Sequence, residues 1–130
     1  MEEIKMSITL PVKATDLYAA WLDSKMHSAF TGGEAQLSKK VHGQFTAWDE
    51  YIIGKNLELL EGKFIRQSWR TIEFKDNAPD SVLELSFEEK AGKTKLSLYH
   101  YNLQKGDGKK YGQGWKDHYF TPMKAYFSGK

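Results

Sequence analysis

The residues best suited to acid–base chemistry in this chain are four histidines, His27, His42, His100 and His118. A histidine can carry a proton near neutral pH or ligate a metal ion. None of the four lies in an H-x-H or H-E-x-x-H pattern, and the chain contains no cysteine. We therefore predict no metal site, no cofactor, no covalent nucleophile and no catalytic residue.

Two of these histidines, His100 and His118, could reach a common cavity. His100 ends a segment in which apolar and polar residues alternate, and His118 shares a helical face with Trp115. A hydrogen-bonded histidine inside the core fits this placement. A polar anchor or a proton carrier inside a ligand pocket fits it as well. Arg70, beside Trp69, also has two possible roles. It could form a structural pair with a residue on a neighbouring strand, or it could bind the carboxylate of a ligand.

The N-terminal part of the chain predicts one strand and two short helices. Apolar residues alternate with polar ones from Ile4 to Leu10, which is the pattern of a half-buried strand. A short helix then runs through Trp21, with Thr15 or Asp16 as its N-terminal cap. Ser24 is expected to cap the second short helix.

The middle of the chain predicts short strands joined by hairpins. Turn residues such as glycine, aspartate and asparagine separate runs that are rich in aromatic and β-branched residues. The runs cover residues 34–39, 45–48, 51–53, 56–60, 64–71, 83–87 and 94–100. Strands joined by successive hairpins form an antiparallel sheet.

The last part of the chain changes to a helical period. Large residues recur at helical spacing at Tyr111, Trp115, Tyr119, Met123 and Tyr126. His118 and Pro122 fall on the same side of this helix. Pro122 lacks a backbone N–H, so we expect it to remove one hydrogen bond and to kink the helix.

These elements predict an α+β fold with a single domain over residues 1–130. A bent antiparallel sheet of about six to seven strands grips a long C-terminal helix, and two short helices follow the first strand. The chain has four Trp, seven Tyr and seven Phe, and large rings can either fill a core or line a ligand pocket. Our candidates for the lining of a cavity between helix and sheet are Phe45, Ile53, Trp69, Leu85, Phe87, Leu98, His100, Trp115, His118 and Tyr119.

Composition excludes several other classes of protein. No apolar run approaches the ~18 residues that a membrane span needs. The first residues, MEEIKMSITL, lack the basic and apolar regions of a signal peptide, so we expect a cytoplasmic protein. Lysines outnumber acidic residues after residue 104, but no basic groove accompanies the strand aromatics. We therefore expect no nucleic-acid partner.

Six segments spread over nearly the whole chain match a known pattern in order and spacing. They cover residues 15–21, 42–45, 53–59, 65–70, 94–100 and 114–126. On these segments the chain resembles the START-like, helix-grip superfamily. Within it, the chain is most similar to the C-terminal domain of the heat-shock protein 90 ATPase activator and its stand-alone homologues. It departs from the pattern where Asp49-Glu50 replaces Asp-Gly and where Phe74 replaces a tryptophan.

The resemblance implies a C-terminal helix that lies across a strongly bent sheet, with a space between them that holds an apolar ligand. We expect a protein that binds a small lipid-like or aromatic molecule. A module that interacts with the heat-shock protein 90 chaperone is the first alternative. A cyclase-like or hydrolase-like enzyme that uses His100 or His118 on an aromatic substrate is the second.

Overall fold

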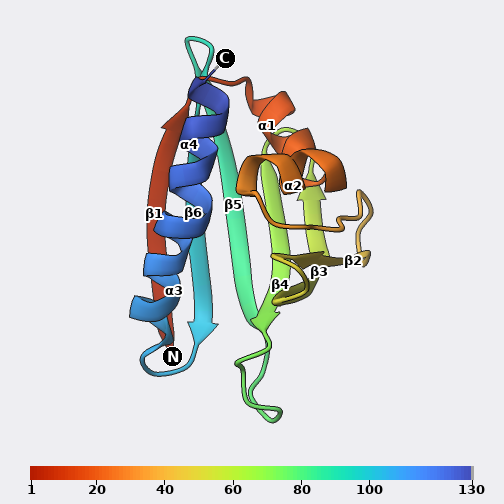
Figure 1. Ribbon diagram of the computed structural model, residues 1–130, viewed down its shortest axis with the longest axis vertical. Helices are drawn as coiled ribbons and strands as arrows, with labels where there is room; N and C mark the ends of the chain where they lie inside the picture. Colours follow the sequence, from red (N-terminus) through yellow and green to blue (C-terminus); the bar gives the residue numbers. More distant parts are fainter. Residues whose placement is uncertain (130) are drawn as a thin grey trace.

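The computed structural model describes residues 1–129 and has the expected α+β architecture (Figure 1). The elements in chain order are β1 (Glu2–Leu10), α1 (Ala14–Trp21), α2 (Ser24–Thr31), β2 (Gln44–Ala47), β3 (Ile52–Leu60), β4 (Phe64–Thr71), β5 (Ser81–Lys90), β6 (Lys93–Leu103), α3 (Asp107–Trp115), the π-helical turn η1 (Lys116–Phe120) and α4 (Thr121–Ser128). No helix among residues 1–129 is both long and apolar enough to cross a membrane.

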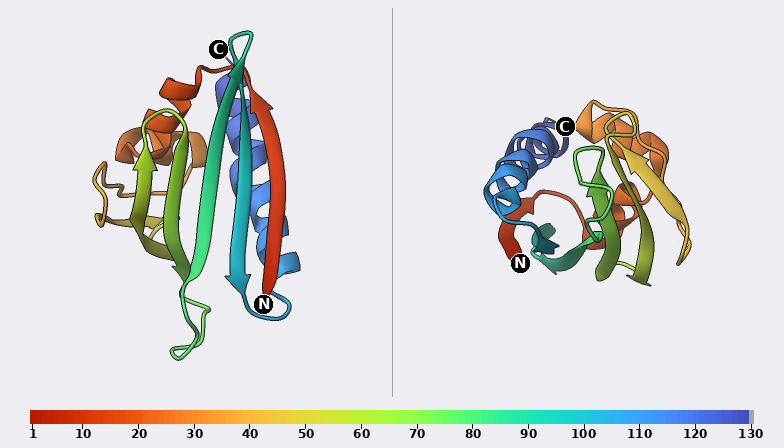
Figure 2. Two further views of the ribbon diagram at one scale, coloured as in Figure 1. Left: turned by 180° about the vertical axis from the view of Figure 1, so that it is seen from behind. Right: turned by 90° about the horizontal axis from the view of Figure 1, so that it is seen from below.

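The six strands form one antiparallel sheet in the order β1-β6-β5-β4-β3-β2. Seen end-on, the sheet curls around its helices, with the C-terminal helix over β1 and β6, while α1 packs against β5 and β6 and α2 against α4 (Figure 2). The alternation predicted for β5 and β6 is confirmed, because Leu85 and its cross-strand partner Leu98 are both buried while Glu84 and Tyr99 face outward. This alternation gives the sheet a dry concave face and a wetter convex one.

Both short helices exist, but neither uses its expected cap. The helix α1 begins at Ala14, whose backbone N–H donates to the carboxylate of Glu89 at 2.9 Å. Thr15 therefore lies inside the helix. In α2 the cap is Asp23, whose carboxylate accepts from the Met26 N–H at 2.9 Å. Ser and Asp are about equally preferred as N-terminal caps, so the sequence does not distinguish Ser24 from its neighbour Asp23.

The expected hairpins are present with two changes. The segment expected as a strand over residues 34–39 makes only one bridge, between Gln36 and Thr46. The segments 51–53 and 56–60 merge into the single strand β3, which carries an irregularity between Asn56 and Glu58. Bulges of this kind increase local twist and help a sheet to curl.

The C-terminal helix, which was expected to kink at Pro122, contains a π turn just before that residue. Thr121 donates its N–H to the carbonyl of Lys116, five residues earlier. In an α-helix, side chains that repeat every four residues rotate about 40° around the helix axis at each repeat. The wider π turn reduces this rotation, so that the repeating rings stay on one face of the helix. Phe127, rather than the expected Tyr126, is therefore the buried ring that follows Met123. Pro122 directly follows the π turn, near the start of α4.

Candidate functional site

A cleft of about 490 Å³ lies between the C-terminal helix and the strands β3 and β4. Its helix side is formed by Tyr111, Gly114, Trp115, His118 and Tyr119. Its sheet side is formed by Trp48 in the β2–β3 turn, Tyr51, Ile52 and Trp69. A concave site lined mainly by apolar and aromatic groups is the usual form of a small-molecule pocket.

Of the ten residues expected at a cavity, four line this cleft: Trp69, Trp115, His118 and Tyr119. Phe45, Leu85, Phe87 and Leu98 are buried in the core away from it. The placement of Ile53 in the cavity is wrong. Ile53 is 43% exposed, and Ile52 takes the inward position. Successive residues of a strand face opposite sides, so an error of one residue in strand phase exchanges the two.

Packed aromatic rings form the floor of the cleft. The ring of Trp69 lies 5.1 Å from that of Tyr111 and 5.7 Å from that of Trp115, measured between centroids. Trp115 in turn contacts Tyr119 at 4.8 Å. Such edge-to-face and tilted contacts stabilise the rings beyond the area that they bury, so the floor is a fixed surface.

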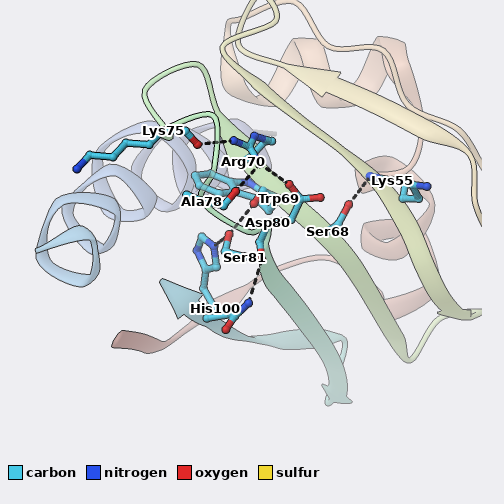
Figure 3. Close-up of polar contacts among 10 residues, drawn as sticks. Lys55, Ser68, Trp69, Arg70, Lys75, Ala78, Asp80, Ser81 and His100 are labelled. Carbon is cyan, nitrogen blue, oxygen red and sulfur yellow. Dashed lines mark hydrogen bonds and ion pairs between the residues drawn. The ribbon is translucent and has the colours of Figure 1, made fainter. Parts of the chain in front are cut away.

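His100 lies behind this floor and holds it in place. Its Nδ1 accepts the indole N–H of Trp115 at 2.9 Å, and its Nε2 contacts the Ser81 hydroxyl at 2.8 Å. The Ser81 hydroxyl donates to the carbonyl of Trp69 at 2.6 Å, so Nε2 must carry the imidazole proton and donate to Ser81 (Figure 3). Burial lowers the pKa of His100 to about 3. The ring is a neutral structural group, which is the first of the two interpretations left open by the sequence.

A second buried histidine, His27, supports the floor from the other end. Its Nδ1 donates to the Trp21 carbonyl at 2.8 Å, and its Nε2 accepts from the Tyr119 hydroxyl at 2.8 Å. Burial lowers the pKa of His27 to about 4 and raises the pKa of Tyr119. Sequence pattern alone did not single out His27, because its partner Tyr119 lies on a distant segment of the chain.

Loop contacts close one side of the cleft mouth. Glu73, in the β4–β5 loop, forms an ion pair with Lys110 of α3 and accepts from the Tyr51 hydroxyl at 2.7 Å. Lys110 and then Tyr51 lower the pKa of Glu73, and the carboxylate raises the pKa of Lys110. Phe74 of the same loop packs against the rings of Trp69 and Tyr111. The loop therefore ties the helix to the sheet at this edge.

Arg70 fixes the far end of this loop. Its guanidinium donates to the carbonyls of Lys75 and Ala78 at 3.0 Å each, and to the Asp80 carboxylate at 2.8 Å (Figure 3). Its polar contacts are therefore with the loop, so Arg70 acts as a structural residue. The ring of Phe74 lies 5.3 Å from the same guanidinium.

Trp48 covers the other side of the mouth in an unusual conformation. Trp48, Asp49 and Glu50 all have positive φ, at 51°, 58° and 72°. Non-glycine residues rarely adopt this region of backbone conformation. The indole packs against Gly33 and contacts the ring of His118 at 5.4 Å. Within residues 1–129, its N–H is buried and has no hydrogen-bond partner.

The part of the chain that the structure describes holds no group of three or more His, Asp or Glu side chains that could bind a metal ion. The cleft therefore offers aromatic surface, a few polar groups at its mouth and two buried neutral histidines behind its walls.

Comparison with known families matches residues 11–128 to the family described as "Activator of Hsp90 ATPase homolog 1-like protein". The chain belongs to this family. A relative that is 26% identical over 125 residues is the uncharacterized protein C1711.08 of Schizosaccharomyces pombe. The match covers 96% of this chain but only 37% of that protein, so the chain spans little more than a third of its length.

Solved structures of other proteins show the same fold. An HSP90 activator from Plasmodium falciparum superposes with a TM-score of 0.89 at 20% identity and covers 98% of this chain and 97% of that one. The Aha1 dimer from Colwellia psychrerythraea gives 0.83 at 13% identity, with 100% and 99% covered. The resemblance predicted from six sequence segments is confirmed at the level of fold and family.

Several cleft residues were not predicted from the sequence. Tyr111 carried a visible signal, because it opens the periodic run of rings on the helix. Trp48 carried a weaker one, since it sits beside a turn that departs from the family pattern. Gly114 and Lys110 gave none, because a glycine or a lysine on a helix is most often merely exposed.

Proposed function

We propose that this protein binds a small apolar molecule, lipid-like or aromatic, in the cleft between the C-terminal helix and the sheet. The observation that carries the proposal is the cleft of about 490 Å³ with its floor of Trp69, Trp115 and Tyr119. A space of this size lies within the range of drug-sized ligand pockets. The chain has no cysteine, and we propose the cytoplasm as the place where it acts.

The construction of the floor supports this proposal. Behind the floor, the indole N–H of Trp115 is hydrogen-bonded to His100, and the hydroxyl of Tyr119 is hydrogen-bonded to His27. Their rings can therefore present apolar surface to the cleft without leaving these polar atoms unpaired. A wall that is organised in advance loses little side-chain freedom when a ligand binds.

Native mass spectrometry of freshly purified protein tests the proposal. We expect a bound species of a few hundred daltons that is released on denaturation. An uncharged fluorescent probe, N-phenyl-1-naphthylamine, then reports whether the emptied cleft binds it. A single species of the polypeptide mass, together with no saturable probe binding, contradicts the proposal.

Gly114 offers a substitution that blocks the cleft. A Cβ at Gly114 meets nothing within 4 Å, so Gly114→Phe places a ring in the cleft without a clash at its first atom. We expect this variant to fold and to lose the bound species. Gly112→Ala is the matched control, because its Cβ meets only Ile4 at 3.9 Å and points away from the cleft.

Interaction with the heat-shock protein 90 chaperone is the second candidate. It is favoured by the family and by the similarity to a structure described as an HSP90 activator. An ATPase assay with that chaperone tests it, with stimulation at micromolar concentrations as the expected result. Unchanged ATPase activity and no co-purification with the chaperone count against it.

A cyclase-like or hydrolase-like activity has less support. Both nitrogens of His100 are bonded to protein groups, and its low pKa leaves it neutral over the physiological range. His118 is exposed at the rim, where water reaches it. A general base in this cleft would have to be a side chain that has no hydrogen bond to other protein groups and is shielded from water.

A further inference from the structure

We propose that Trp48 selects ligands that carry a hydrogen-bond acceptor, such as a carbonyl oxygen on an uncharged planar aromatic framework. This inference rests on the proposed ligand-binding function and names the class of molecule that the cleft prefers. Its basis is the hydrogen-bond inventory of the cleft, together with the backbone conformation of the turn that carries Trp48.

Most polar groups of the cleft walls already have protein partners. The hydroxyls of Tyr51, Tyr111 and Tyr119 pair with Glu73, Thr71 and His27, at distances of 2.7 to 2.8 Å. The indole N–H of Trp115 is bonded to His100. Across residues 1–129, the indole N–H of Trp48 is the buried side-chain donor left without an acceptor.

An unpaired buried donor is unfavourable, because it has lost its hydrogen bond to water and gained none in return. A ligand that brings an acceptor to this N–H removes the penalty, whereas a purely apolar ligand leaves it in place. The cleft should therefore distinguish two molecules of the same shape that differ only in an acceptor. Sites with an unmatched polar group reject ligands that cannot pair it.

The turn that carries Trp48 has an unusual backbone conformation, and its neighbours bear on how the indole could meet a ligand. Three successive residues, Trp48 to Glu50, hold left-handed backbone conformations that disfavour their side chains. The indole rests between Gly33 and the exposed ring of His118. Because the N–H is buried, the proposal requires the indole to turn so that its N–H reaches the acceptor of the ligand.

The charges around the cleft favour an uncharged ligand. Lys110 is neutralised by Glu73, and the carboxylate of Asp117 accepts two hydrogen bonds from Gln113 at 2.9 and 3.0 Å. A charged ligand would have to compete with these pairs. The tryptophan and tyrosine rings of the walls instead favour the face or edge of another aromatic ring.

The test compares two probes, fluorenone and fluorene, which share a three-ring framework and differ in one carbonyl group. Isothermal titration with the wild-type protein is expected to give roughly three- to tenfold tighter binding of fluorenone, which is the effect of one net hydrogen bond. Trp48→Phe keeps an aromatic ring and removes the N–H. We expect the ratio of the two Kd values to fall to near one in this variant.

Two further measurements identify the donor. His118→Phe removes the neighbouring ring nitrogens, and the ratio should persist in it. In ¹⁵N spectra of the wild-type protein, fluorenone should shift the Trp48 indole N–H resonance downfield, whereas fluorene should not. This resonance is assigned from its contact with the His118 ring, so the measurement does not depend on how well Trp48→Phe folds.

The outcomes separate this inference from the function on which it rests. If both probes bind the wild-type protein with equal affinity, or if the preference survives in Trp48→Phe, the role of Trp48 is wrong while binding in the cleft stands. If the preference is lost in His118→Phe instead, the donor is His118 and the inference is wrong. If neither probe binds, the cleft is not a site for planar aromatic molecules and both proposals fail for that class.

Discussion

The two buried histidines predict that the folded state loses stability steeply between pH 7 and pH 5. An unfolded histidine titrates near 6.5, whereas burial lowers the pKa of His100 to about 3 and that of His27 to about 4. At pH 5 the unfolded chain therefore binds a proton at each position that the folded protein does not. Proton binding to the unfolded state alone favours unfolding, so stability falls as the pH decreases through 6.5.

The size of the loss follows from these values. Between pH 7 and pH 5, protonation of one histidine with a pKa of 6.5 stabilises the unfolded state by about 2 kcal/mol. The two histidines together cost about 4 kcal/mol, which is a large fraction of the stability of a typical domain. The result holds for any folded-state pKa that lies well below 5, and the loss ends only as the pH falls through the folded values near 4 and 3.

Urea unfolding followed by tryptophan fluorescence at pH 7 and pH 5 measures this loss. His100→Gln can keep one donor and one acceptor without titrating, and it should remove about half of the pH dependence. His42→Gln is the control, because His42 is exposed on a loop. Equal stability at pH 7 and pH 5 in the wild-type protein would refute the assignment of both histidines as buried neutral groups.

Three further substitutions test the walls and the mouth of the cleft. Gly54→Ala places a Cβ 1.9 Å from the Ser68 carbonyl oxygen, and we expect a loss of about 3 kcal/mol in urea unfolding. Gly33→Ala brings a Cβ within 2.5 Å of the Trp48 ring, so it should displace the indole and red-shift its fluorescence emission. Glu73→Gln breaks the ion pair with Lys110, and stopped-flow measurements should show faster probe entry and release; unchanged rates would contradict a closing role for the β4–β5 loop.

The sequence was sufficient to predict the fold where a repeating pattern specified it. Alternation predicted β5 and β6, and the period of large rings predicted the C-terminal helix. Features that depend on a single residue were harder to predict. Ile52 and Ile53 are exchanged because a shift of one residue along a strand turns each side chain to the opposite face. The π turn arises because large residues repeat every four positions here, whereas an α-helix has 3.6 residues per turn.

The candidate site was only partly predictable for a related reason. Periodicity indicates which side chains point inward, so it identified Trp69, Trp115 and Tyr119. It does not indicate which inward groups are already satisfied by partners on distant segments. His100 was ambiguous and His27 was not singled out until the structure showed their hydrogen bonds. A buried polar residue reveals its role only through those partners.

The cleft combines a fixed floor with a mouth made of loops, and this division bears on how ligand preference arises. The floor rings lie on β4 and the C-terminal helix, with histidines bonded behind them, so a change there alters folding as well as binding. The mouth consists of the Trp48 turn and the loop that carries Glu73, where side chains can change at little cost to the core. Under the proposed binding function, a rigid apolar floor would accept many flat molecules of suitable size. Discrimination among them therefore falls to the mouth, where the unpaired N–H of Trp48 lies.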